Sequence, residues 1–159
     1  MFEQLTKAAR TMVADAEHEA ESAGATAIEA EHLVLAISAR AGSPAAATLA
    51  SAGLDHARLV ELLAEERRRS LATAGVDPEN DAARQVPRRH RSLRLATSVK
   101  SLFERAVREA GLHRTRTIDE AQLLVAGLQA EVGTVPRLVA LAGVDREGLI
   151  ARLRERPAA

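Results

Sequence analysis

Acidic side chains come directly before an apolar run at two places in this chain. At 28–37 the polar residues are Glu29, Glu31 and His32, and the apolar run follows them. At 118–127 two acidic residues hold the same place. This pattern indicates a helix N-terminus, where free backbone N–H groups and the helix dipole favour negative charge. The same side chains could instead bind a cation, either a metal ion or the guanidinium group of an arginine.

These roles can be ranked from residue types alone. A metal ion is disfavoured because metal sites usually need three or four converging ligands. Helix capping is the favoured role of Glu31, and local packing or hydrogen bonding is the favoured role of His32. The alternative is a site in which Glu31 pairs with a guanidinium while free N–H groups take a phosphate. Thr6, at the start of the first expected helix, could add its hydroxyl group to that site.

The two acidic stretches belong to an internal repeat with an offset of 90 residues. Without any gap, this shift places Ile28 on Ile118 and aligns the Ala-Gly-hydrophobic-Asp run at 52–55 with the same run at 142–145. Chance matches between alanines are frequent in so alanine-rich a chain, but a shared four-residue run with glycine and aspartate is not. The sequence therefore predicts two copies of one unit.

We place the two units at 1–66 and 93–156, joined by a charged linker at 67–92. The linker has no apolar periodicity, and it contains Pro78, Pro87 and many charged residues. Such a composition predicts a mobile, solvated segment that proteases cut first.

Each unit shows apolar residues at helical spacing, which predicts four helices. In the first unit we expect helices over about 5–23, 29–41, 44–52 and 55–69, and in the second unit helices that contain Val99 or begin near Asp119, Thr134 and Asp145. No segment alternates as a half-buried strand does, so the expected fold is all-α: two tandem pseudo-symmetric four-helix repeats, eight helices in all, packed into one double-repeat domain. The residues expected to be buried include Met12, Val13, Leu33, Leu63, Leu102, Phe103, Val107 and Leu123.

The composition excludes several function classes. The formal net charge is zero, so no overall field favours nucleic acid or a membrane surface. The chain has no cysteine, which excludes disulfides and thiol chemistry. It also has no Gly-Lys-Ser/Thr phosphate-binding loop. We expect no catalytic residues, no cofactor and no metal. One sequence does not exclude Ser-His-Asp catalysis, but no serine of this chain lies in a Gly-x-Ser-x-Gly turn, which would favour it.

With neither a signal peptide nor a stretch of membrane-span length, the expected location is the cytoplasm. Two arginine-rich segments, at 67–69 and at 88–91 with Arg94, could contact phosphates. No aromatic residue lies among these arginines and the overall charge is balanced, so a solvated linker is the favoured interpretation. A helical regulator that binds nucleic acid through these arginines is an alternative.

Taken together, the two tandem units resemble the N-terminal domain of Clp-type Hsp100 unfoldases, with the greatest similarity to the ClpC branch. The resemblance covers nearly the whole chain. In the first unit it is carried by Met1-Phe2-Glu3, Thr6, the stretch 28–37, the alanines at 45–47 and Gly53-Leu54. The second unit departs from the family pattern, because Arg114 stands where a glycine is usual and Ala121-Gln122 replaces Glu-His.

The resemblance implies a module that docks substrates and adaptors of Clp proteases, and not an enzyme. In the ClpC branch such domains recognise phosphorylated arginine, and small cyclic peptides are aimed at them. By this resemblance Glu31 would pair with the guanidinium and Thr6 would hold the phosphate, in a pocket that also contains Phe2 and His32. Ala30 stands where the family commonly has a threonine, which weakens this pocket.

The corresponding positions of the second unit are Ala121 and Ala96, so the resemblance implies that the second pocket is lost or altered. Asp119 or Glu120 could take over there only if its side chain reached in. No ATPase module lies within the 159 residues. The chain would then be either a free-standing domain that delivers or sequesters clients of the Clp machinery, or a fragment of a larger unfoldase.

Overall fold

The computed structural model describes residues 2–77 and 92–155. Within these ranges it contains eight α-helices, as predicted, with one short 3-10 helix and two strands of two residues each. The elements are η1 (Phe2–Gln4), α1 (Lys7–Ser22), β1 (Ala27–Ile28), α2 (Ala30–Ala39), α3 (Pro44–Ser51), α4 (His56–Thr73), β2 (Arg94–Leu95), α6 (Thr97–Leu112), α7 (Glu120–Leu128), α8 (Thr134–Ala142) and α9 (Arg146–Arg154).

Local capping residues set the starts of most helices where the sequence predicts them. Ser43 caps α3 by accepting a hydrogen bond from the backbone N–H of Ala46, and proline holds the first helical position. Asp55, Asp119 and Asp145 each accept a backbone N–H in the first turn of α4, α7 and α9. These helix starts are therefore fixed by short-range interactions.

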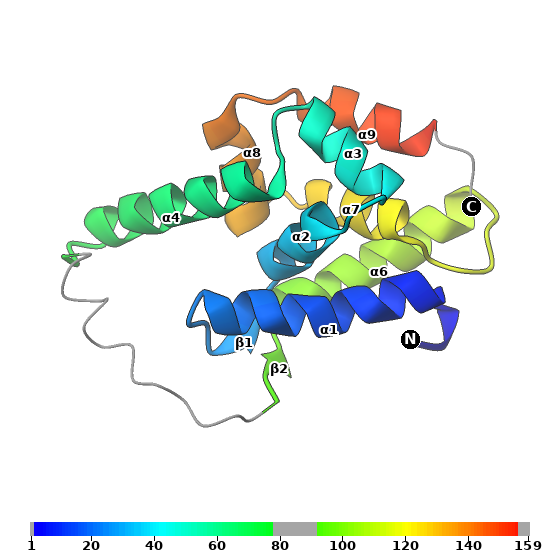
Figure 1. Cartoon of the computed structure of the whole chain (residues 1–159), viewed down its shortest axis with the longest axis horizontal. Helices are drawn as coiled ribbons and strands as arrows, with labels where there is room; N and C mark the ends of the chain where they lie inside the picture. Colours follow the sequence, from blue (N-terminus) through cyan, green and yellow to red (C-terminus); the bar gives the residue numbers. More distant parts are fainter. Residues whose placement is uncertain (1, 78–91, 156–159) are drawn as a thin grey trace.

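The fourth helix is longer than predicted. It continues to Thr73, four residues beyond the expected end near residue 69, and so extends into the range 67–92 that was assigned to the linker. Arginine has a high helix propensity, and this end of α4 projects beyond the rest of the molecule, where no apolar face is required (Figure 1). Residues 78–91, which include the segment 88–91, lie outside the described residues, so the mobility of the linker stays a prediction.

The bounds of the helices confirm the repeat. α1 and α6 have bounds that differ by the same 90 positions at both ends, and α2 and α7 also begin 90 positions apart. Two residues that occupy the same place in the two units are called repeat partners below. Thr6 and Ala96, for example, are repeat partners at the starts of α1 and α6.

Hydrogen bonds cross between the two repeats near these helix starts. Ile28 of β1 pairs in parallel with Leu95 of β2, and their repeat partners, Ile118 and Leu5, form an isolated parallel bridge. Two further backbone bonds repeat this relation: Ala96 N donates to Ile28 O at 2.9 Å, and Thr6 N donates to Ile118 O at 3.0 Å. The sequence predicts no strand, which is wrong because two-residue strands are too short to show a period. It also places Leu5 in a helix, which is wrong because Leu5 forms the isolated bridge with Ile118.

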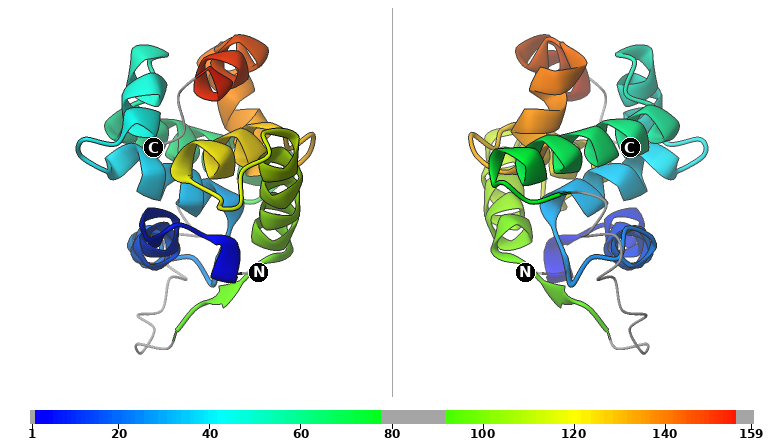
Figure 2. Two further views of the ribbon diagram at one scale, coloured as in Figure 1. Left: turned by 90° about the vertical axis from the view of Figure 1, so that its right-hand side faces the viewer. Right: turned by 90° about the vertical axis from the view of Figure 1, so that its left-hand side faces the viewer.

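The helices cross between the repeats as well. α2 and α7 lie in the middle of the molecule, with α1 and α6 below them and the other four helices above (Figure 1). The third helix of each repeat packs on the fourth helix of the other, α3 on α9 and α4 on α8. Figure 2 shows the two repeats facing each other across α2 and α7. Both repeats share one core, which confirms the prediction that they pack into one double-repeat domain.

Most residues that were expected in the core are buried there. Met12, Leu33, Leu102, Phe103 and Leu123 are each at most 1% exposed. Val13 and Leu63 are only partly buried, and they pack against the edge of the core. Val107 is 40% exposed, so its predicted inward orientation is wrong.

The two central helices are apolar on nearly every face, as expected for helices surrounded by protein. Among residues 2–77 and 92–155, no single helix is long and apolar enough to cross a membrane. Only α2 and α3 taken together reach that length and composition, and the chain bends by 99° between them. Both helices contribute to the core.

Position 114 is the one described non-glycine residue with a positive φ. Arg114 has φ 54°, and its repeat partner Gly24 has φ 66°. Both follow a helix C-terminus, where the next residue donates to the carbonyl five positions back: Ala25 N to Ala20 O, and Thr115 N to Ala110 O. The second unit has therefore kept the left-handed turn without the glycine that tolerates it.

Replacing Arg114 with glycine is expected to stabilise the protein. A left-handed conformation costs an L-residue about 1–2 kcal/mol, and the greater freedom of glycine in the unfolded chain offsets part of the gain. We expect the free energy of unfolding to rise by about 0.5–1 kcal/mol, measured by urea denaturation. The control is Arg116→Gly in the same loop, where no positive φ is present, and it should be neutral or destabilising. Equal effects of the two variants would contradict this account.

Candidate functional site

Glu31 lies in the first turn of α2, as predicted, and its carboxyl group is mostly removed from water. Burial raises the pKa of this carboxyl above its usual range, and the negative charges of Glu29 and Glu66 raise it further. Hydrogen bonds from its own backbone N–H and from the Thr134 side chain oppose the rise without cancelling it. Within the described residues, no lysine, arginine or histidine forms an ion pair with Glu31. A desolvated carboxylate without a cation is a group that a ligand can satisfy.

His32 supports the start of α2 from a buried position. It is 3% exposed, and its Nδ1 accepts a hydrogen bond from the backbone N–H of Glu29 at 2.9 Å. Burial lowers the pKa of His32, while the charges of Glu29 and Glu19 oppose that shift. Its repeat partner Gln122 makes the same bond, accepting from Asp119 N at 3.0 Å. The role in local hydrogen bonding that was favoured for His32 is therefore the one seen.

The start of α6, and not that of α1, lies beside Glu31. Ser98 Oγ accepts from Ala30 N at 3.1 Å and donates to Glu29 Oε2 at 2.7 Å. Ala96 gives α6 no side-chain cap, so its first N–H groups have no side-chain acceptor. Ala96, which was assigned from the sequence to a lost second pocket, thus lies near Glu31 of the first unit.

Thr6 is not brought together with Glu31. Its backbone N–H bonds to Ile118 O, and its hydroxyl accepts from Ala9 N at 3.1 Å as the cap of α1. Near this end of α1, Ala8 O accepts from the Arg40 side chain, which follows the end of α2. Nine helical residues, about 14 Å, separate Glu31 from that end. The structure thus places Thr6 beside the start of α7 and not beside Glu31, because the repeats cross.

Thr6 instead lines a pocket of about 440 Å³ at the start of α7. The walls come from the starts of α1, α3 and α7 and from the ends of α6 and α9. Ala121 lies in this pocket with apolar neighbours, which gives the second unit a cavity despite its missing glutamate. The lining residues are Thr6, Ala8, Pro44, Ala45, Glu109, His113, Thr115, Asp119, Glu120, Ala121, Gln122, Val125, Leu153 and Arg154.

One charged group of this pocket, Glu109, is held by a cluster of donors. It is 2% exposed, and Arg154 binds both carboxylate oxygens, at 2.6 and 2.9 Å. His113 and Gln129 add contacts at 3.1 and 3.2 Å. The hydrogen bond from Arg154 lowers the pKa of Glu109 below its usual range, even though burial opposes it.

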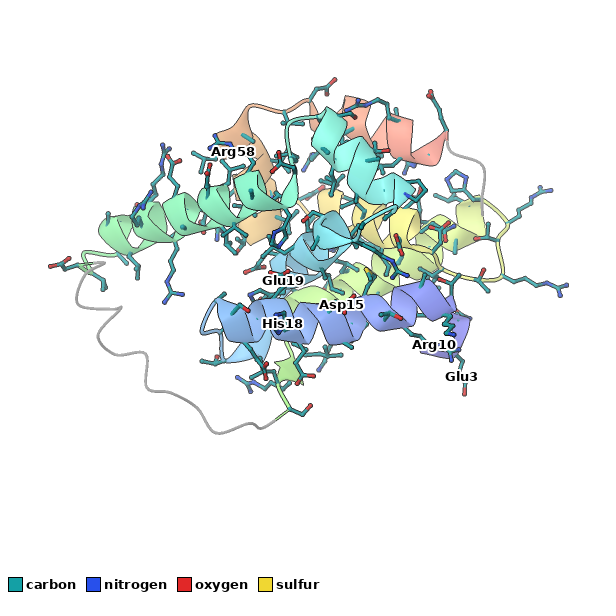
Figure 3. The ribbon with its side chains drawn as sticks, viewed as in Figure 1. Glu3, Arg10, Asp15, His18, Glu19 and Arg58 are labelled. Atoms are coloured by element: carbon teal, nitrogen blue, oxygen red, sulfur yellow. The ribbon has the colours of Figure 1, made fainter. Side chains whose placement is uncertain are left out.

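The repeat partner of Glu109 has a different partner. Glu19 lies on the side of α1 that faces α4 (Figure 3), and its Oε1 is 2.9 Å from His56 Nε2. The two units therefore hold an acid at the same position by different means: an arginine from α9 binds the buried Glu109, and a histidine from α4 binds the partly buried Glu19.

Glu120 is also paired within the chain. Its Oε1 lies 3.2 Å from Arg40 Nη1, and its Oε2 accepts from Ser43 Oγ at 2.6 Å. Asp119 caps α7, so neither acid is free to replace the missing glutamate at position 121. Sequence reasoning missed Arg40, because the contact joins residues 80 positions apart.

The remaining sequence-based candidates add little to the site. In the described part of the chain, no group of three or more His, Cys, Asp or Glu side chains could hold a metal ion. Of the arginine run 67–69, Arg69 pairs with Glu65, and Arg67 also has a partner. The side chain of Phe2 lies outside the part of the structure that can be described.

Comparison with solved structures finds the same fold in the N-terminal domains of ClpD and Hsp104 and in a structure from a malarial protein secretion system. The N-terminal domain of ClpD, a chaperone associated with caseinolytic protease from Arabidopsis thaliana, matches with a TM-score of 0.72 at 20% identity, over 97% of this chain and 94% of that one. The Hsp104 N-terminal domain from Candida albicans matches with a TM-score of 0.65 at 12% identity, over 96% and 90%. A structure from a malarial protein secretion system matches with a TM-score of 0.65 at 17% identity, over 95% and 92%.

At these identities the similarity concerns the fold. No curated protein sequence is significantly similar to the chain. The family model of the Clp repeat (R) N-terminal domain matches residues 4–142, which span both repeats from the bridge at Leu5 to the end of α8. The chain therefore belongs to the Clp repeat N-terminal domain family.

Proposed function

We propose that this chain is a non-catalytic docking domain whose Glu31 receives arginine side chains of client or adaptor proteins of the Clp machinery. Membership of the Clp repeat family supports the docking role. The observation that carries the finer proposal is the Glu31 carboxylate, which is mostly buried and has no cation among the described residues. A guanidinium group matches such a carboxylate best, because two parallel N–H donors can reach both oxygens.

Phosphorylated arginine is the ligand form that the family resemblance suggests. The uncapped start of α6 supports a place for its phosphate, since helix N-termini bind phosphate through free N–H groups. The carboxylate of Glu29, 2.7 Å from Ser98 Oγ at the same helix start, opposes a second negative charge. Modified and unmodified arginine are therefore the two ligands to compare.

The pocket beside α7 supports a second contact for uncharged parts of the same client, or for a cyclic peptide. Its carboxylates at Glu109 and Glu120 are already paired with Arg154 and Arg40, so they leave little free charge for a ligand. Its volume of about 440 Å³ is within the range of small-ligand sites. Apolar walls from Pro44, Val125 and neighbouring residues favour apolar side chains.

The test is calorimetric titration of the full chain with three forms of one peptide: with phosphoarginine, with arginine and with citrulline, which is neutral and nearly the same shape. We expect one ligand per chain and no binding of the citrulline form. Glu31→Gln should weaken binding by about one to two decades, the cost of losing a charged partner. Glu120→Gln, at the other helix start, should leave the affinity within about twofold. Equal affinities for Glu31→Gln and the unchanged protein would contradict the proposal.

The same variant gives a readout that separates ligand binding from a structural role. Because the pKa of Glu31 is raised in the folded state, the ionised group lowers stability at neutral pH, and Glu31→Gln should unfold at a higher temperature. This advantage is complete above the raised pKa and disappears as the pH falls through it towards the usual range of glutamate. A residue that only capped α2 would instead lose stability on this substitution.

A further inference from the structure

Arg40 pairs with Glu120, the acid at the start of α7 that could otherwise bind the arginine of another protein. Its Nη1 lies 3.2 Å from Glu120 Oε1 and donates to Ala8 O at 3.3 Å. The Ser43 hydroxyl donates to the other carboxylate oxygen at 2.6 Å. The Glu120 side chain is only 13% exposed, while the Arg40 side chain is 34% exposed, so the carboxylate is the more sheltered member of the pair.

The repeat partners of these three residues cannot form such a pair. Alanine stands at position 30 opposite Glu120 and at position 130 opposite Arg40, and glycine stands at position 133 opposite Ser43. The acid of the first repeat, Glu31, lies one position further along its helix and has no basic partner within the described ranges. The two helix starts thus differ chiefly in whether the chain itself supplies the guanidinium.

We propose that the start of α7 is a latent guanidinium site which Arg40 keeps occupied, so that the chain accepts an external arginine at one helix start only. Glu120 also lines the 440 Å³ pocket together with Thr6 and Ala121. An arginine side chain that enters this pocket therefore approaches the same carboxylate from outside. The choice of arginine as the ligand rests on the function proposed above, but the site is a different one: Glu120 at the start of α7 in place of Glu31 at the start of α2.

The test is a titration of the isotope-labelled full chain with N-acetyl-arginine amide, followed by the backbone amide signals of each residue. In the unchanged protein we expect shifts near the start of α2 and not near that of α7. Arg40→Gln removes the charge and keeps a donor for Ala8 O, so a second, saturable set of shifts should appear at 119–122, where the unchanged protein shows none at the same concentrations of N-acetyl-arginine amide. The double variant Arg40→Gln/Glu120→Gln should lose this second set.

Arg58→Gln is the matched control, since it removes an arginine from the exposed pair with Glu61. If folded Arg40→Gln shows shifts at α2 alone, the latent site is wrong while the role of Glu31 stands. If it shows shifts at α7 alone, the latent site stands and the role of Glu31 is wrong. No shifts at either place would overturn both. Arg40→Met, which keeps the apolar stem, serves as the second variant if Arg40→Gln does not fold.

Discussion

Replacing Arg154 with alanine is expected to lower the free energy of unfolding by about 2–3 kcal/mol at neutral pH. The substitution removes two hydrogen bonds from Glu109, whose carboxylate is 2% exposed and so cannot regain water in their place. A charged group that stays buried with fewer partners carries most of that cost. Urea denaturation of the two proteins measures the difference.

The way in which the free energy of unfolding depends on pH follows from the carboxyl group of Glu109. Its lowered pKa in the folded state stabilises the protein at pH values above the usual range of glutamate, and this contribution is lost as the pH falls through the lowered pKa. Without Arg154, burial should raise the pKa of Glu109 instead. The gap in stability between the two proteins should therefore narrow in acid, and a gap that is constant down to pH 3 would contradict this explanation.

Two further variants test whether the lower stability of Arg154→Ala comes from the unpaired carboxylate of Glu109. Arg152→Ala, on the same helix, removes only an exposed contact with Ser51 and should change stability by less than about 0.5 kcal/mol. Glu109→Gln in the Arg154→Ala background should recover about 1 kcal/mol or more, because an amide is cheaper to bury than a carboxylate. Failure of that recovery would point to lost packing of the Arg154 stem.

The second large effect is expected for Phe103→Ala. Phe103 is 1% exposed in the shared core, and truncating a buried phenylalanine typically costs about 3–5 kcal/mol because the cavity collapses only in part. The loss should appear in the midpoint of urea unfolding with an unchanged slope, as expected when the fold is retained.

Its repeat partner provides the comparison. Val13 occupies the same place in the first unit, but it is only partly buried at the edge of the core. Val13→Ala removes less apolar surface from water and should cost about 1 kcal/mol. If both substitutions cost the same, the two units contribute equally to the core, contrary to the burial seen here.

The parts of the fold that the sequence predicts are those that short-range interactions decide. Capping by Ser43, Asp55 and Asp145 acts over three residues, and helical spacing is visible within one element. The end of α4 was missed because the apolar spacing that marks a helix stops before residues 70–73, although these residues are helical. The strands were missed because two residues show no period.

The candidate site was predictable only in part, for a reason that concerns the repeat. An offset of 90 residues shows which residues correspond, but not which repeat each helix start faces. Glu31 and Thr6 therefore looked like partners, whereas the backbone bonds from Ala96 to Ile28 and from Thr6 to Ile118 place each beside the other unit. The ion pair of Arg40 with Glu120 had no local signal either, because its members lie in different units.

The crossed hydrogen bonds also constrain how two copies of one sequence can diverge. A substitution at one helix start changes the surroundings of a residue in the opposite copy, so compensation has to arise across the copies and not within one. Arg40 and Glu120 fit this rule: the acid stands in the second copy and its arginine in the first, while neither repeat partner has kept the corresponding side chain. Among relatives of this chain, correlated changes should therefore join positions in opposite halves, and each half should become steadily less able to replace the other.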